Sequence, residues 1–229
     1  MIEEILPPLV ASAEAFDDRD AVALFPEEEA AVARAVDKRR REFTTARGCA
    51  RRALAVLGLP PVPIVPGERG APGWPAGVVG SMTHCDGYRA SAVAREEQVR
   101  TVGLDAEPNE PLPDGVLEVI ATPSERAWIE QRDGDRSSVC WDRLLFSAKE
   151  SIYKAWFPLT RRWLDFEEAV VTPDPDARTF TALLRVPGPV VDGRALTGFT
   201  GRWTVSRGLV ATAIAVLAAV PERPAAGPR

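Results

Sequence analysis

The chain has 229 residues, of which 45% are hydrophobic, and a formal net charge of −5 at pH 7. This size and apolar content allow one large domain or two small ones, and the acidic balance does not favour a dedicated nucleic-acid binder. Three cysteines without a CxxC pair and one histidine argue against zinc and favour a reduced, cytoplasmic protein. The start, MIEEILPPLV, lacks signal-peptide features, and the longest apolar run, 208–220, is too short to span a membrane.

The first predicted element is one long helix over residues 26–58. Pro26 and the three glutamates after it suit a helix start, and Gly58 suits the stop, with Gly48 as a candidate kink. Its second half gathers cations within residues 38–52: Lys38, Arg39, Arg40, Arg41, Arg47, Arg51 and Arg52. Such a run can be a solvated face or a surface that binds an anionic ligand or nucleic acid.

The middle of the chain predicts a loop, two strands and short helices. Residues 60–80 are rich in proline and glycine and predict a long surface loop of the kind that is often functional. The segments 88–94 and 99–106 predict two strands joined by the charged turn REEQ. Short helices are expected within 114–133, with Ser124 as a candidate cap.

An amphipathic helix is predicted from Ser137 to about Phe157, because apolar residues recur there at spacings of four and three. These residues are Trp141, Leu145, Ala148, Ile152 and Ala155. The segment 199–219 predicts a hairpin that turns at SRG and ends in a buried strand, and residues 221–229 are expected to be disordered. No repeat or polar linker divides the chain, so any boundary is expected near residue 100, between strands.

The stretch VGLDAEP, residues 102–108, places Asp105 and Glu107 on one face of a predicted strand, together with Gly103, which permits close packing. Two like charges about 7 Å apart repel each other unless a cation lies between them. The stretch is either a strand end that reaches solvent or a divalent cation site. Mg²⁺ typically takes one or two carboxylates and completes its shell with waters and phosphate oxygens, and the lack of soft ligands favours Mg²⁺ or Mn²⁺ over zinc.

The stretch FSAKESIYKAW lies in the predicted amphipathic helix. Glu150 and Lys154 are four residues apart and share a helical face. The same face carries Arg143 and Ser147 and lies apart from the apolar stripe, so it is expected to be free for solvent or a ligand. Taken alone, the pair is an ordinary surface ion pair contributing about 0.3–0.5 kcal/mol. Together with the two strand acids, Glu150 would complete a set of three carboxylates for one hard cation, with Lys154 suited to a phosphate.

The stretch GSMTHCDGYRA, residues 80–90, contains the single histidine, His84. A lone histidine is more often a structural hydrogen-bonding group than a catalyst. Here it follows a glycine-rich loop and the hydroxyls of Ser81 and Thr83, a local chemistry that suits a phosphate-binding loop.

In this order, GSMTHC, VGLDAEP and FSAKESIYKAW resemble the signature blocks of the Sfp-type 4'-phosphopantetheinyl transferases, in particular the enterobactin-type branch of actinobacteria. KRRREFTTARGCARRAL and PGWPAGVVGS are similar to the N-terminal half of that family, so the resemblance covers about residues 26–219. The acid-x-acid pair combined with Lys-Glu-x-x-x-Lys is far more specific than a single glycine motif.

The resemblance implies a monomeric α+β fold of two similar α/β halves, with coenzyme A in the cleft between them. Residues 1–102 would form the N-terminal half and residues 103–220 the C-terminal half. It further implies transfer of the phosphopantetheine arm of coenzyme A to a serine of an apo acyl or peptidyl carrier protein, releasing adenosine 3',5'-bisphosphate. Such enzymes serve fatty-acid, polyketide or nonribosomal peptide assembly, siderophores included.

The resemblance also assigns roles to residues of the motifs. Asp105, Glu107 and Glu150 would hold Mg²⁺ against the diphosphate of coenzyme A. Glu150, or a water that it orients, would be the base for the carrier serine, and Lys154 would stabilise charge on the diphosphate. The residues expected to contact coenzyme A are Arg39, Arg47, Arg69, Ser81, Thr83, His84, Lys149 and Lys154. Among them, Arg39 and Arg47 would meet the 3'-phosphate, and Arg69 stands where many relatives have a lysine.

Two other classes stay open at this level. One is a nucleic-acid-binding module that uses residues 38–52, against which the net negative charge and the lack of interleaved aromatic residues argue. The other is a catalytically inactive, coenzyme A-binding regulatory protein, against which the retained acids and Lys154 argue.

Overall fold

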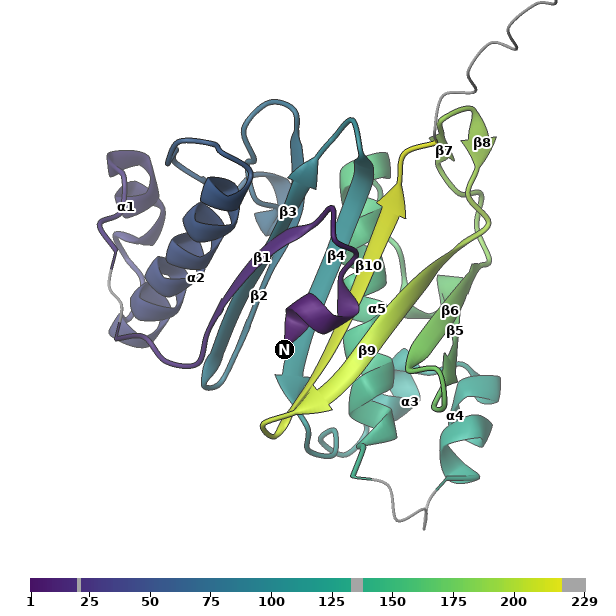
Figure 1. The fold of residues 1–229 in the computed structure, drawn as a ribbon. Helices are drawn as coiled ribbons and strands as arrows, with labels where there is room; N and C mark the ends of the chain where they lie inside the picture. Colours follow the sequence, from purple (N-terminus) through teal and green to yellow (C-terminus); the bar gives the residue numbers. More distant parts are fainter. Residues whose placement is uncertain (20–21, 133–137, 220–229) are drawn as a thin grey trace, which may run out of the picture.

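The computed structural model describes residues 1–19, 22–132 and 138–219 (Figure 1). Its helices are η1 (Ile2–Ile5), α1 (Pro26–Val32), α2 (Asp37–Val56), η2 (Glu68–Gly70), α3 (Val116–Ile120), α4 (Pro123–Glu130), α5 (Trp141–Thr160) and η3 (Phe166–Glu168). Its strands are β1 (Ala11–Ala15), β2 (Val78–Cys85), β3 (Tyr88–Arg95), β4 (Val99–Pro108), β5 (Ala169–Asp174), β6 (Thr179–Leu184), β7 (Val190–Val191), β8 (Arg194–Ala195), β9 (Gly198–Ser206) and β10 (Leu209–Leu217). The predicted disordered tail, 221–229, lies outside the described residues.

Two antiparallel sheets carry the fold. The smaller has the strand order β1-β3-β2 and is covered by α2, whereas the larger has the order β4-β10-β9-β6-β5 and is covered by α5. Figure 1 shows η1 on the face of the larger sheet that is opposite α5, where it packs on β9 and β10. A helix on a sheet therefore recurs in each part of the chain, as the predicted α+β class of two similar halves requires. Because η1 packs on the larger sheet, the assignment of residues 1–102 and 103–220 to separate halves stays a prediction.

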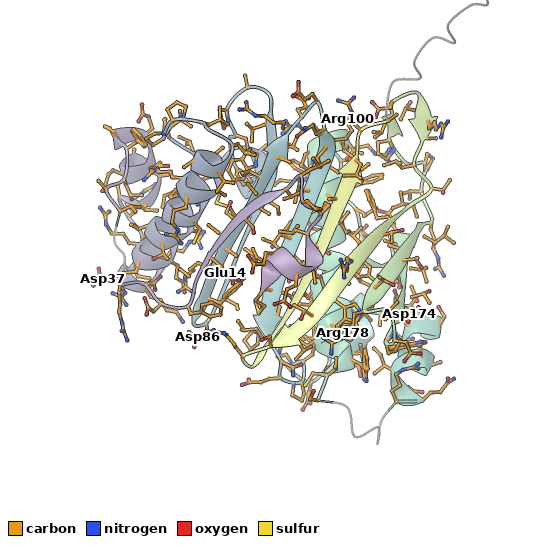
Figure 2. All side chains as sticks on the ribbon, viewed as in Figure 1. Glu14, Asp37, Asp86, Arg100, Asp174 and Arg178 are labelled. Atoms are coloured by element: carbon orange, nitrogen blue, oxygen red, sulfur yellow. The ribbon has the colours of Figure 1, made fainter. Side chains whose placement is uncertain are left out.

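The N-terminal segment is fixed across the sheets by Glu14 of β1, whose position Figure 2 marks. Its carboxylate accepts hydrogen bonds from the amino group of Met1 at 2.8 Å and from the hydroxyl of Tyr88 in β3 at 2.6 Å. A partly buried carboxylate that accepts several hydrogen bonds is well satisfied. These contacts hold η1 in place over the larger sheet.

The prediction of one helix over residues 26–58 is wrong, because the chain breaks between α1 and α2 at residues 33–36. The buried side chains of Glu28 and Val32 turn α1 against α2, which a straight helix does not allow. The candidate kink at Gly48 is also wrong, since α2 continues through it.

The segment predicted as a phosphate loop is strand β2. The hydroxyls of Ser81 and Thr83 lie on one side of it and accept the backbone N–H groups of Leu104 and Ala106 in β4, each at 3.1 Å. An edge strand otherwise presents unpaired backbone amides. The loop prediction is wrong because hydroxyls two residues apart share a face in a strand, and here they join the smaller sheet to the edge of the larger one.

The predicted strands at 88–94 and 99–106 are confirmed as β3 and β4, but they do not pair with each other. β3 lies between β1 and β2, whereas β4 pairs with β10. The predicted hairpin at 199–219 is confirmed as β9 and β10. It turns at Arg207 and Gly208, whose φ values of 55° and 73° are typical of a two-residue type I' turn. The sequence did not predict β1, β5 or β6.

The predicted helices after β4 are confirmed, but the capping residue of one and the ends of another differ from the prediction. α3 and α4 occupy the expected region, but Thr122 rather than Ser124 caps α4, because its hydroxyl accepts the N–H of Glu125 and its own N–H donates to the Glu125 carboxylate. The amphipathic helix is α5, which starts and ends a few residues later than predicted. The whole apolar stripe from Trp141 to Ala155 is buried.

We expect Thr212→Val to destabilise the protein by about 1–3 kcal/mol, the usual cost of unpairing buried polar groups. The Thr212 hydroxyl is fully buried in β10, donates to the Ser147 carbonyl at 2.9 Å and lies 3.0 Å from the Ser147 hydroxyl. Thr181→Val, at an exposed position of β6, is the matched control and should change stability by less than about 0.5 kcal/mol. Urea unfolding of both variants measures the difference, and equal midpoints would contradict the expectation.

Candidate active site

A cavity of about 670 Å³ opens between α2, the loop 67–74 and β2 on one side and α5 on the other. This volume is within the range of small-molecule sites. The predicted site residues that line it are Arg39, Arg47, Arg69, Ser81, Thr83, His84, Glu150 and Lys154. The other three, Asp105, Glu107 and Lys149, do not line the cavity.

One end of the cavity is cationic. A guanidinium nitrogen of Arg39 lies 2.6 Å from Nε2 of His84. Because arginine can only donate, Nε2 is the acceptor and the imidazole is neutral. Burial and the Arg39 charge lower the pKa of His84, which agrees with this assignment. The pair therefore presents the Arg39 charge to the cavity with its orientation defined.

Arg47 is the second cation at this end and is almost buried. Its guanidinium lies 3.6 Å from the centre of the Phe43 ring, and its Nε donates to the Ile64 carbonyl at 3.1 Å. Burial lowers the pKa of Arg47 to about 10, against the opposing charge of Glu28, so the side chain remains charged at neutral pH. A fixed, desolvated guanidinium suits a phosphate.

Asp105 does not line the cavity itself but is bonded to two residues that do. Its Oδ1 accepts hydrogen bonds from Lys154 Nζ at 2.7 Å and from the Thr83 hydroxyl at 3.3 Å. Its Oδ2 is buried without a hydrogen-bond partner. A buried carboxylate that is satisfied on one oxygen only is unusual in a folded protein, and it marks a place where a further positive group fits.

Glu107 follows Asp105 on the same strand face, as predicted. Its carboxylate pairs with Arg143 of α5 at 3.2 Å. Burial and the neighbouring Asp105 charge raise the pKa of Glu107 to about 7, against the opposing Arg143. Within the described residues, no group of three or more His, Cys, Asp or Glu side chains forms a ready metal site, and these two acids are paired with cations of the chain instead.

Glu150 lies on α5 between two cavities. It lines the large cavity and a second one of about 140 Å³, whose wall is mostly apolar and includes Tyr153, Trp163 and Phe166. Burial raises the pKa of Glu150, although Lys154 opposes this shift. A carboxylate with a raised pKa is a better proton acceptor near neutral pH than a solvated one.

Comparison with known proteins decides the family. Residues 27–94 match the model of the 4'-phosphopantetheinyl transferase N-terminal domain, and residues 101–205 match that of the 4'-phosphopantetheinyl transferase superfamily. The chain is 61% identical over 221 residues to 4'-phosphopantetheinyl transferase Svp of Streptomyces mobaraensis. The matched region covers 95% of this chain and 90% of that protein. The chain belongs to the 4'-phosphopantetheinyl transferase family.

Two further relatives agree. The transferase is 52% identical over 223 residues to 4'-phosphopantetheinyl transferase Npt of Nocardia iowensis. The matched region covers 94% of this chain and 99% of that protein. The transferase is 48% identical over 222 residues to 4'-phosphopantetheinyl transferase PptT of Mycobacterium tuberculosis, and this match covers 93% and 97% respectively. The resemblance drawn from the motifs is thus confirmed, and the chain is an enzyme of this class. None of the helices in the described ranges is long and apolar enough to cross a membrane.

One face of α5 was expected to be free for solvent or a ligand, and for much of this face the prediction is wrong. The face carries Arg143, Ser147, Glu150 and Lys154. Ser147 is fully buried against β10. Lys154 reaches across to Asp105 of β4 instead of pairing with Glu150. The reason is the close approach of α5 to β4 at Gly103, where a Cβ atom would lie only 1.9 Å from the Ser151 carbonyl oxygen. In the transferase this contact brings the two acidic motifs together.

Lys149 does not line the large cavity, but it lines the second one, and its ammonium lies in the interior beside α4. Its ammonium donates to the carbonyls of Phe166 at 2.6 Å and Ala169 at 3.0 Å and pairs with Glu125 at 3.0 Å. These contacts use all three of its donors. Neighbouring residues of a helix point about 100° apart, so Glu150 reaches the large cavity and Lys149 does not, although both line the second cavity. The expected contact of Lys149 with coenzyme A stays a prediction.

We expect Glu125→Gln to destabilise the transferase by about 3–5 kcal/mol, because it leaves the buried Lys149 ammonium without its counter-charge. Both side chains are only 2% exposed, and Glu125 also accepts the N–H groups of Thr122 and Val171. Glu130→Gln on the exposed side of the same helix is the matched control and should have little effect. Thermal and urea unfolding measure both variants, and similar melting temperatures would contradict the expected cost.

Several cavity-lining residues were not singled out from the sequence. They are Glu42, Phe43, Trp74, Tyr153 and Arg161. Tyr153 lies three positions after Glu150 and therefore on a neighbouring part of the same helical face, a signal that was available. Trp74 belongs to the loop between α2 and β2, where no periodicity indicates which side chains point inward.

The cations of residues 38–52 are mostly engaged within the molecule. Lys38 pairs with Asp86, which Figure 2 marks at the β2–β3 turn, at 3.3 Å. Arg40 pairs with Glu29, and Arg51 with Glu28. A run whose charges are largely paired or turned into a cavity does not favour the nucleic-acid alternative.

Proposed function

We propose that this transferase moves the 4'-phosphopantetheine arm of coenzyme A to a serine of an apo acyl or peptidyl carrier protein and releases adenosine 3',5'-bisphosphate. The main support is the cavity lined by the cationic Arg39 and Arg47 and by Glu150 and Lys154, the last of which is bonded to Asp105. Coenzyme A carries phosphates at the corresponding two places, one on the ribose and two in the diphosphate. We further propose that the enzyme acts as a monomer in the cytoplasm, on carriers of fatty-acid, polyketide or nonribosomal peptide assembly.

The acidic cluster fits a hard divalent cation. The unpartnered Oδ2 of Asp105 offers a buried anionic ligand. Burial first, and then the neighbouring Asp105 charge, raise the pKa of Glu107, and a bound cation would offset both effects. All candidate donors are carboxylate oxygens, the ligands preferred by Mg²⁺ and Mn²⁺. Asp105, Glu107 and Glu150 would hold the ion, which when bound neutralises charge on the diphosphate and orients it.

Lys154 has two possible partners in this arrangement. In the structure its ammonium neutralises Asp105. With Asp105 serving as a cation ligand, Lys154 would be free at the cavity wall to stabilise the negative charge that accumulates on the leaving phosphate. Displacement at phosphorus depends mainly on such charge stabilisation and on alignment.

Glu150 is the proposed proton acceptor for the carrier serine. The serine oxygen forms a bond to the phosphorus of the phosphopantetheine group, and the bridging P–O bond of the diphosphate breaks. The serine proton passes to Glu150, directly or through a water, and the leaving group departs as adenosine 3',5'-bisphosphate. The raised pKa of Glu150 suits this step.

The second cavity suits the uncharged part of the donor. Because Glu150 lines both cavities, a diphosphate held beside Glu150 would place the nucleotide in the large cavity and direct the pantetheine arm towards Tyr153 and Trp163. The Trp163 side chain is 51% exposed and apolar, so it gains by covering such an arm.

The test is intact-mass analysis of apo carrier proteins incubated with the purified enzyme, coenzyme A and Mg²⁺. We expect each accepted carrier to gain the mass of one phosphopantetheine group, and the gain to disappear with EDTA and return with added Mg²⁺. A panel of apo acyl and peptidyl carriers should be used, with serine-to-alanine carriers as the control. The proposal fails if no carrier of the panel gains mass although the enzyme is folded.

A further inference from the structure

Glu28 of α1 is a fully buried carboxylate outside the cavity. Its Oε2 accepts the N–H of Phe25 at 3.0 Å and pairs with the guanidinium of Arg51, and its Oε1 accepts the N–H of Ile64 at 2.8 Å. Ile64 lies 36 residues away in the chain, in the loop that follows α2. A buried charge with this many directed contacts holds its partners in defined positions.

Ile64 connects Glu28 to the cavity. The amide N–H of Ile64 is held by Glu28, and the carbonyl of the same residue accepts Nε of Arg47 at 3.1 Å. The Ile64 side chain is itself fully buried in the core between α2 and the smaller sheet. The next residue, Val65, accepts the N–H of Gly73 at 2.9 Å and so closes the base of the loop that lines the cavity.

We propose that Glu28 is a positioning residue for substrate binding: through Ile64 it orients the guanidinium of Arg47 towards the 3'-phosphate of coenzyme A. This inference rests on the proposed function. Arg47 is held on one side by the Phe43 ring and on the other by the Ile64 carbonyl, so its terminal nitrogens have one direction in which to meet a ligand. Without Glu28, the Ile64 peptide loses its anchor and Arg47 loses that direction.

Whether a Glu28 variant binds coenzyme A more weakly or more tightly distinguishes a positioning role of Glu28 from a purely electrostatic one. The negative charge of Glu28 opposes an anion at Arg47, so removing only that charge would tighten coenzyme A binding. Loss of positioning instead weakens binding, by about tenfold for one misplaced charge-assisted hydrogen bond. Glu28→Gln is the most conservative variant: it keeps the shape, but in either orientation its amide NH2 group meets a donor, Ile64 N–H on one side or Phe25 N–H and Arg51 on the other, so the contacts of the carboxylate cannot all be kept.

The experiment measures the dissociation constants of coenzyme A and dephospho-coenzyme A by calorimetry for the full-length enzyme and its variants. We expect Glu28→Gln to weaken coenzyme A binding about tenfold, to leave dephospho-coenzyme A binding nearly unchanged, and to have no further effect in an Arg47→Ala background. With a carrier substrate, KM for coenzyme A should rise while kcat stays within about twofold. Glu29→Gln is the matched control, since Glu29 is the next residue of α1 and pairs only with Arg40 among the described residues.

Unchanged or tighter coenzyme A binding by Glu28→Gln would overturn the inference, and so would an equal loss in the wild-type and Arg47→Ala backgrounds. If Glu28→Gln does not fold, Arg47→Lys decides the matter, because lysine keeps the charge but cannot both hold the Ile64 carbonyl and reach the phosphate. Loss comparable to that of Arg47→Ala supports the inference, and wild-type binding by Arg47→Lys overturns it. Failure of the wild-type enzyme to bind coenzyme A would instead reject the proposed function, and this inference with it.

Discussion

Asp105→Asn is expected to lower the rate of phosphopantetheine transfer by at least about 100-fold, because residues that only support metal ligands already cost 10–100-fold. Oδ2 of Asp105 is a buried carboxylate oxygen that lacks a hydrogen-bond partner among the described residues. Asp105 also holds Lys154 at 2.7 Å. Asparagine keeps the shape but supplies no charge for a cation or for the ammonium. The measurement is the initial rate of carrier modification as a function of Mg²⁺ concentration.

Asp86→Asn is the matched control for this prediction. Asp86 lies at the β2–β3 turn, is mostly exposed and pairs with Lys38 on the surface (Figure 2), so transfer should stay within about twofold of the wild type. Thermal unfolding must show that Asp105→Asn is folded. If the folded variant turns over at a near-normal rate and with a normal Mg²⁺ dependence, Asp105 is not a metal ligand.

Gly103→Ala is expected to have the largest effect on stability. A Cβ atom there would lie 1.9 Å from the carbonyl oxygen of Ser151 and 2.9 Å from the amide nitrogen of Ala155, both in the backbone of α5. Backbone cannot move aside as a flexible side chain can, so β4 and α5 must separate. Overpacking costs about 1–3 kcal/mol where side chains can adjust, and we expect more here. The variant should accumulate as insoluble protein or melt far below the wild type.

The transfer activity of Gly103→Ala provides a second test. β4 carries Asp105 and α5 carries Glu150 and Lys154, so any folded Gly103→Ala protein should also lose transfer. Gly87→Ala is the control: Gly87 has a positive φ but no atom within 4 Å of the added Cβ, so it should cost only about 1 kcal/mol of backbone strain. Comparable melting temperatures for the two variants would show that the close approach at Gly103 is not essential.

Local patterns predicted the elements well where periodicity was clear. The stripe from Trp141 to Ala155 identified α5, and the turn at Arg207 and Gly208 identified the β9–β10 hairpin. They failed where the decisive contact is distant. The break after Val32 depends on burial of Glu28 against α2. The hydroxyls of Ser81 and Thr83, whose chemistry suggested a loop, lie on strand β2 and accept backbone N–H groups of β4.

The motifs identified most of the site but not its internal pairing. Asp105, Glu150 and Lys154 were grouped from residue type and spacing, yet spacing paired Lys154 with Glu150, whereas the fold pairs it with Asp105. Lys149 belongs to the same motif, but the structure uses it to tie α5 to Glu125 and the start of β5. Apart from Tyr153, the aromatic wall of the cavity has no sequence signature, because it is assembled from a loop and two helices.

The sequence by itself determined which chemical groups this protein has, namely its carboxylates and its two motif lysines. The order of these residues along the chain also determined the family. The sequence determined both because residue identity and short-range spacing are properties of the chain alone. Only the tertiary structure decided which of these groups meet. The approach of α5 to β4 at Gly103 and the anchoring of Ile64 by Glu28 join segments tens of residues apart, and such contacts depend on the packing of complete sheets and helices, which no local pattern encodes.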